Sequence, residues 1–98
     1  MGLFGPSLTE KIRRSAAEAF PQAEWKIDVD WSTGEKLHQL RGSLNDQRTD
    51  DDTLQFAKDV WAAVTKKFRL SPDDGADGLL KVFVTSTGGS VQCTGVAG

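Results

Sequence analysis

The sequence predicts an α+β domain with the element order αββαββ, in which two helices pack on a four-stranded, mainly antiparallel sheet. Two segments carry apolar residues at intervals of three and four, the period of a helix with one buried face. Four other segments alternate apolar and polar residues, the period of a strand with one buried face. Such elements combine most economically as a two-layer sandwich, with both helices on one face of the sheet.

The length of the chain favours a single domain. It has 98 residues, and one hydrophobic core typically gathers about 100 to 150. We expect a domain over residues 7–98, preceded by a flexible arm over residues 1–6, which contain two glycines and a proline. The arm lacks the basic and apolar regions of a signal peptide, and no stretch approaches the roughly 20 apolar residues of a membrane span. We therefore expect a cytoplasmic protein without an integral membrane segment.

The first helix is predicted over residues 7–20. Ser7 and Glu10 have the spacing of a capping box, in which each side chain bonds the backbone amide of the other residue. Pro21 ends the helix, and Phe20 closes its last turn against the core. The predicted inner face comprises Leu8, Ile12, Ser15, Ala16 and Ala19.

A β-hairpin follows over residues 24–44. The stretch Glu24 to Trp31 alternates charged and apolar residues, which directs Trp25, Ile27, Val29 and Trp31 inward. Residues 32–34 are turn formers, and the return strand over residues 37–44 has Leu40, Gly42 and Leu44 on one side.

The second helix is predicted to begin near Leu54, after a polar connection that ends in acidic residues suited to the positive end of a helix dipole. Its apolar stripe also fits two turns of a coiled coil, but a coiled coil needs three or more heptads, so a face turned to the core is preferred. The stripe comprises Leu54, Ala57, Val60, Trp61, Val64 and Phe68.

Two more strands are predicted, over residues 79–86 and 90–97. The inner side of the first carries Leu80, Val82 and Val84, and that of the second carries Val91, Cys93 and Ala97. Both hairpins have a Ser-Thr-Gly turn and a late glycine, which indicates an internal repeat of about 54 residues. The alternative is that any two hairpins with polar turns look related.

Charge and composition limit the classes of partner that we expect. A net charge of −2 and a pI near 5.2 provide no overall attraction for nucleic acid or anionic lipid. The two basic clusters, residues 11–14 and 66–69, lie beside acids or at a helix end and have no interleaved aromatic residue to stack bases, so we expect no nucleic-acid partner. With one cysteine and one histidine, the chain can form no intrachain disulfide and no zinc site of Cys and His, and we expect no cofactor.

Two motifs for chemistry are weak. Residues 73–78 resemble the start of a calcium-binding EF-hand loop, but Gly75 and Val84 stand where ligands belong, so an acidic solvated loop is preferred. His38 and Cys93 suggest a base and a nucleophile, with Asp28 or Asp30 as orienting carboxylate. However, Cys93 has the parity of a core residue, and His38 is interpreted as a partly exposed strand residue. We expect no catalytic and no metal site, and no enzyme.

The sheet face away from the helices is the most informative surface. Its odd member is Phe83, which is either covered by Leu37, Leu79 or the N-terminal arm, or contacts a partner or a second copy of the chain. The candidate interaction surface comprises Phe83, Lys81, Thr85, Arg41, Gln39, Lys26, Asp28 and Asp30, and the same parity adds Gln92 and Thr94.

Over about residues 8–64 the chain resembles the BON domain. The resemblance is carried by the helix and strand, the glycine-containing turn, and Leu37-x-x-Leu40-x-Gly42-x-Leu44 followed by an acidic helix start. It implies a bacterial-type module that binds phospholipid or another small ligand in envelope proteins. The longer hairpin turn, the fourth strand and the missing export signal depart from the family, and no functional residue is carried over.

The sequence therefore favours a small non-enzymatic interaction domain that binds a protein partner, or itself as a homodimer, through the sheet face around Phe83. The alternative is a lipid or small-ligand binding module like the BON domain.

Overall fold

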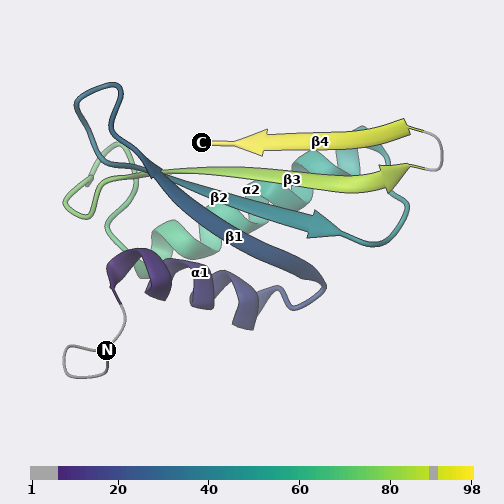
Figure 1. Ribbon diagram of the computed structural model, residues 1–98, viewed down its shortest axis with the longest axis horizontal. Coiled ribbons are helices and arrows are strands. Elements are labelled where there is room, and N and C mark those ends of the chain that lie inside the picture. The colour runs from purple at the N-terminus through teal and green to yellow at the C-terminus, as the bar shows by residue number, and fades with distance from the viewer. Residues whose placement is uncertain (1–6, 89–90) are drawn as a thin grey trace.

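The computed structural model describes residues 7–88 and 91–98, and its elements follow the predicted αββαββ order (Figure 1). They are α1 (Leu8–Ala19), β1 (Ala23–Asp30), β2 (Leu37–Leu44), α2 (Asp50–Lys67), β3 (Leu79–Gly88) and β4 (Val91–Ala97). The predicted α+β class is therefore confirmed. The N-terminal arm expected over residues 1–6 lies outside the described residues, as does Ser90, with which the last strand was expected to begin.

The four strands form one mixed sheet in the order β1-β2-β3-β4. The two outer pairings, β1 with β2 and β3 with β4, are antiparallel, as expected for two hairpins. The central pairing of β2 with β3 is parallel, because α2 carries the chain back to the starting end of β2 before β3 begins. The sequence left open which strands of the two hairpins meet, and this parallel contact answers that question.

Both helices contribute to the same buried core as one face of the sheet. Alternate residues of β2 and β3 point into it, as the period-2 pattern predicts. Two buried hydroxyls, Thr53 on α2 and Ser86 on β3, satisfy each other through a hydrogen bond of 2.9 Å. The apolar core comprises Ile12, Ala16, Trp25, Leu40, Leu44, Phe56, Ala57, Val60, Val64, Leu70, Leu80, Val82, Val84 and Ala97.

The first helix begins as predicted, with one change in the cap. The hydroxyl of Ser7 accepts a hydrogen bond from the Glu10 amide at 3.2 Å. The Glu10 carboxylate does not return to Ser7, because it accepts hydrogen bonds from the guanidinium groups of Arg13 and Arg14. Chiefly through the bond from Arg13, this pairing lowers the pKa of Glu10 to about 2. Ala19, expected on the inner face, is exposed.

The second helix begins four residues earlier than predicted. Thr49 is its N-cap and accepts from the Asp52 amide at 3.1 Å, so the acidic residues form the first helical turn. Its buried face is also rotated from the predicted stripe. It carries Thr53, Phe56, Ala57, Val60 and Val64, whereas Leu54, Trp61 and Phe68 are only partly buried.

The predicted position of Trp31 in the hairpin is wrong. It was expected inward with Trp25, but β1 ends at Asp30 and the Trp31 side chain is 62% exposed. The Asp30 carboxylate accepts from the backbone amide of Ser32 at 2.9 Å and from its hydroxyl at 3.1 Å, which turns the chain out of the strand. These bonds also lower the pKa of Asp30.

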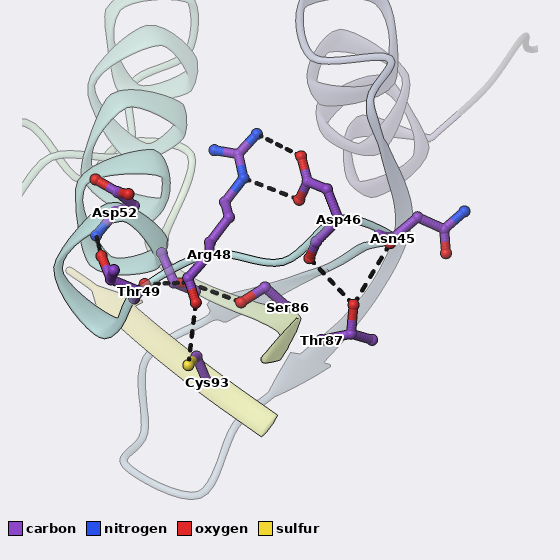
Figure 2. Close-up of polar contacts among 9 residues, drawn as sticks. Asn45, Asp46, Arg48, Thr49, Asp52, Ser86, Thr87 and Cys93 are labelled. Carbon is purple, nitrogen blue, oxygen red and sulfur yellow. Dashed lines mark hydrogen bonds and ion pairs between the residues drawn. The ribbon is translucent and has the colours of Figure 1, made fainter. Parts of the chain in front are cut away.

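Polar contacts tie the connection between β2 and α2 to the far end of β3 (Figure 2). The hydroxyl of Thr87 donates to the carbonyl of Asp46 at 3.1 Å, and Arg48 pairs with the Asp46 carboxylate at 2.9 Å. Thr87 lies beyond the predicted end of its strand at Ser86, since β3 continues to Gly88.

Candidate functional site

The sheet face opposite the core, here called the open face, brings together most of the predicted surface residues. The strand register places Lys26, Arg41, Phe83 and Val96 side by side in one row across all four strands. The next row toward the start of β2 contains Asp28, Gln39 and Lys81, and the row on the other side contains Glu24, Ser43, Thr85 and Thr94. Phe83 therefore lies near the centre of the open face.

Two cations flank the ring of Phe83. The guanidinium carbon of Arg41 lies 4.6 Å from the ring centroid, and the ammonium of Lys81 lies 5.7 Å from it. Both distances are in the range of cation–π attraction. Leu37 and Leu79 pair with each other four residues along β3 from Phe83, about 13 Å away. Phe83 remains partly exposed.

Arg41 is itself held in place from β1 and β2. Its guanidinium lies 3.6 Å from the Asp28 carboxylate and donates a hydrogen bond of 3.1 Å to the side-chain oxygen of Gln39. The Arg41 and Asp28 side chains are 49% and 57% exposed, so their pairing orients Arg41 and contributes little to stability. The arrangement presents a planar cation and an aromatic ring next to each other.

Val96 belongs to this surface and was missed by the sequence interpretation. It pairs with Phe83 across β3 and β4, and 41% of its surface is exposed. The parity that assigned Gln92 and Thr94 to the open face extends to residue 96 and could have found it. Phe83 and Val96 together form an apolar patch with charged residues around it.

A shallow depression of about 260 Å³ adjoins this patch. It is lined by Glu24, Lys26, Arg41, Gly42, Ser43, Phe83 and Thr85. Asp30, the last of the predicted surface residues, lies apart from it, because its carboxylate serves the turn after β1.

A larger concavity of about 730 Å³ lies at the loop end of the molecule, which the sequence did not indicate. The exposed ring of Trp31 lines it together with the loops before β2 and before β3. Its other lining residues are Leu8, Glu35, Lys36, Pro72, Gly75, Ala76, Asp77, Gly78 and Leu79.

The structure separates His38 from Cys93. His38 pairs with Leu80 near the start of β3, whereas Cys93 pairs with Ser86 near its end. Six residues of strand correspond to about 20 Å. These side chains therefore do not form a nucleophile and its base.

His38 is fully buried and not partly exposed as expected. Its Nε2 lies 3.1 Å from the backbone carbonyl of Asp77, and its Nδ1 has no hydrogen-bond partner among the described residues. Burial lowers the pKa of His38, which keeps the ring neutral.

Cys93 is a partly buried thiol that donates to the backbone carbonyl of Arg48 at 3.4 Å (Figure 2). The neighbouring carboxylate of Asp50, together with burial, raises its pKa. An activated cysteine needs a lowered pKa, so the setting of Cys93 is that of a structural residue.

Within residues 7–88 and 91–98, no group of three or more His, Cys, Asp or Glu side chains is arranged to hold a metal ion. In the same part of the chain, no helix is long and apolar enough to cross a membrane. Comparison with protein-family models, with curated proteins and with solved structures finds no match for this chain.

Proposed function

We propose that this domain binds a protein partner through the open face, with Phe83 at the centre of the contact. The observation that carries the proposal is the row in which Phe83 and Val96 stand side by side, partly exposed, with Arg41 against the ring. The helices and the buried core occupy the other face, so within the described residues the helices leave the open face uncovered. We place this activity in the cytoplasm and assign no catalytic step to the domain.

The chemistry of the patch supports a protein partner. Burying a phenylalanine or valine side chain completely is worth about 1.5 to 3 kcal/mol relative to leaving it exposed. Residues that dominate binding energy at protein interfaces are enriched in aromatic side chains and arginine and lie at the centre of the contact. Asp28, Gln39 and Lys26 would then form a polar rim that selects a partner with complementary charges.

A second candidate is binding of a lipid or small ligand, as the resemblance to the BON domain implies. It is favoured by the basic side chains of Lys26, Arg41 and Lys81 around an aromatic ring and a depression. Co-sedimentation with vesicles of anionic and of neutral phospholipid tests it. Retention on anionic vesicles that is lost with Phe83→Asp would assign the open face to a lipid instead of a protein.

The test of the protein proposal is a pull-down from host lysate with wild type, Phe83→Asp and Ala62→Asp as parallel baits, after circular dichroism has shown that all three are folded. Ala62→Asp is the matched control, because it adds the same charge at an exposed position of α2, away from the sheet. A protein retained by wild type and Ala62→Asp but lost with Phe83→Asp is then purified and its Kd measured with each variant. We expect at least a tenfold weaker Kd for Phe83→Asp. Equal retention by all three baits, or by none, would refute the proposal.

A further inference from the structure

The last strand of the sheet offers a second interface, along its outer edge. β4 is an edge strand, because among the described residues β3 is its only neighbour in the sheet (Figure 1). Apart from the β3–β4 ladder, no backbone hydrogen bond involves residues 91–98 within the described part of the chain. The outward peptide groups of β4 are therefore ready to pair with another strand.

β4 also lacks the usual protection against such pairing. The strand reads Val91-Gln-Cys-Thr-Gly-Val-Ala97 and contains neither a charged residue nor a proline. Natural sheets commonly block exposed edges with charges, prolines or bulges. An unprotected edge of seven residues is a template for a partner strand.

The opposite edge of the sheet is protected by charge. β1 carries Glu24, Lys26, Asp28 and Asp30 on the open face. If two copies of β1 paired antiparallel with their faces matched, a central register would set Glu24 against Asp28 or Asp30 of the other copy. Like charges directly opposite each other destabilise a strand pair. These like-charge pairs disfavour self-pairing at β1, whereas β4 has no charged residue to oppose it.

The side of α2 that lies beneath β4 indicates which kind of partner would pair with this edge. A Cβ atom on Gly95 would lie 2.6 Å from the backbone of Leu54, so α2 runs close under β4. Leu54 and Trp61, one heptad apart, lie on the flank of α2 away from α1 and are only partly buried. An isolated peptide strand added to β4 would leave this flank uncovered. A second copy of the chain brings its own α2 beneath its own β4 and covers it.

From these observations we propose that the protein forms a two-fold dimer in which β4 pairs antiparallel with β4 of a second copy. Such pairing joins the two sheets into one. In the register that pairs all seven residues, Thr94 meets its own counterpart on the axis, Gln92 faces Val96, and Cys93 faces Gly95. No charges oppose each other. The ladder forms along the edge of β4, which adjoins the open face at Thr94 and Val96, and the proposal does not rest on the proposed function.

A stable dimer needs contacts between the flanking helices as well as the strand ladder. A seven-residue strand is about 23 Å long and its edge about 5 Å high, so the ladder itself covers on the order of 100 Å². A stable dimer buries about 800 Å² on each partner. Leu54 and Trp61 below the sheet, and Val96 above it, supply apolar area next to the ladder.

The test measures oligomeric state by sedimentation equilibrium over about 1 to 100 μM, where mass action populates a dimer with a micromolar Kd. Wild type is expected to approach twice the chain mass of 10.6 kDa. Thr94→Lys places two ammonium groups at the axis and should weaken the dimer at least tenfold. Thr85→Lys is the matched control, because Thr85 pairs with Thr94 on the same face but lies one strand inside the edge. It should dimerise like wild type.

Several results would overturn the proposal: a wild-type monomer throughout the range, a dimer that survives Thr94→Lys, or equal loss with Thr85→Lys. A dimer that survives Thr94→Lys and is lost with Phe83→Asp would place self-association on the open face instead. Hydrogen exchange of the wild-type protein gives a test without mutation. Amides of β4 should gain protection as concentration rises, and unchanged protection in a dimer would also refute the pairing.

Discussion

The indole ring of Trp25 on β1 occupies the space above Gly42, its partner on β2, in which any other residue would place a Cβ atom. A Cβ built on Gly42 would lie 2.5 Å from Cζ3 of the ring. The indole NH donates to the carbonyl of Phe20 at 2.9 Å, which fixes the ring over the strand. Gly42 is thus required by a close approach between neighbouring strands.

Gly42→Ala should destabilise the fold by about 1 to 3 kcal/mol, because the added methyl group overpacks the contact with Trp25. Denaturant unfolding gives the free energy of unfolding. Ser43→Ala, at the exposed neighbouring position, is the control and should change it by less than about 0.5 kcal/mol. In a Trp25→Leu background Gly42→Ala should cost less, since the clashing ring is gone. An equal cost in both backgrounds would show that the ring is not the cause.

Phe56→Ala should be among the most damaging substitutions, at about 3 to 5 kcal/mol. Phe56 is buried between Phe20, at 5.5 Å in an edge-to-face arrangement, and Trp25, stacked at 6.2 Å. Its removal leaves a cavity between α1, α2 and β1. Thermal and denaturant unfolding measure the loss, and a cost under about 1 kcal/mol would contradict the orientation of α2.

Trp61→Ala should cost less than Phe56→Ala, about 1 to 3 kcal/mol, because Trp61 is only partly buried. Its indole NH donates to the carbonyl of Leu80 at 2.9 Å, so part of the loss is that hydrogen bond. Trp61→Phe, which keeps the ring but removes the donor, should lie between wild type and Trp61→Ala. Measurement at low protein concentration separates this effect from any loss of dimer. If Trp61→Ala lowered the free energy of unfolding more than Phe56→Ala does, the buried helix face predicted from the sequence would be correct.

Phe56 and Trp61 show how much of α2 the spacing of apolar residues could predict. The three-and-four spacing correctly identified α2 and three of its buried residues, Ala57, Val60 and Val64. It chose Leu54 and Trp61 over Phe56 because apolar residues surround the helix over a wide arc. Only the position of α1 and β1 decides that Phe56 is covered.

The strands were predicted well wherever one face is buried, because burial enforces alternation. Trp31 continues the alternation of β1, yet the turn made by Asp30 and Ser32 removes it from the strand. The parallel pairing of β2 with β3 depends on residues far apart in the chain, so no local pattern encodes it. The open face followed from parity alone. The contact between Arg41 and Phe83 did not, because it needs the register between strands.

Cys93 should resist alkylation in the folded protein. Its thiol is partly buried and hydrogen-bonded to Arg48, and its pKa is raised, so little of the reactive thiolate forms near neutral pH. Mass spectrometry after iodoacetamide treatment should show slow modification that becomes rapid in denaturant. Modification as fast in the native protein as in the unfolded protein would reopen a reactive role for this residue.

His38 should make the fold less stable as pH falls below about 6.5, the ordinary pKa of histidine. Burial lowers its pKa in the folded state, so the unfolded chain takes up the proton first and unfolding is favoured as pH falls through that range. The carboxylates of Glu10, Asp30 and Asp46 titrate lower, since their pKa values are all depressed. Denaturant unfolding between pH 7.5 and pH 5 therefore reports mainly on the histidine.

Because His38 is the only histidine in the chain, its imidazole resonance gives an independent reading by NMR titration. The folded protein should titrate below the ordinary value, and His38→Gln should lose the dependence of unfolding free energy on pH in this range. A titration at or above the ordinary value would mean that the ring is solvated or paired with a carboxylate. It would then contradict the buried neutral imidazole that holds the loop carbonyl of Asp77.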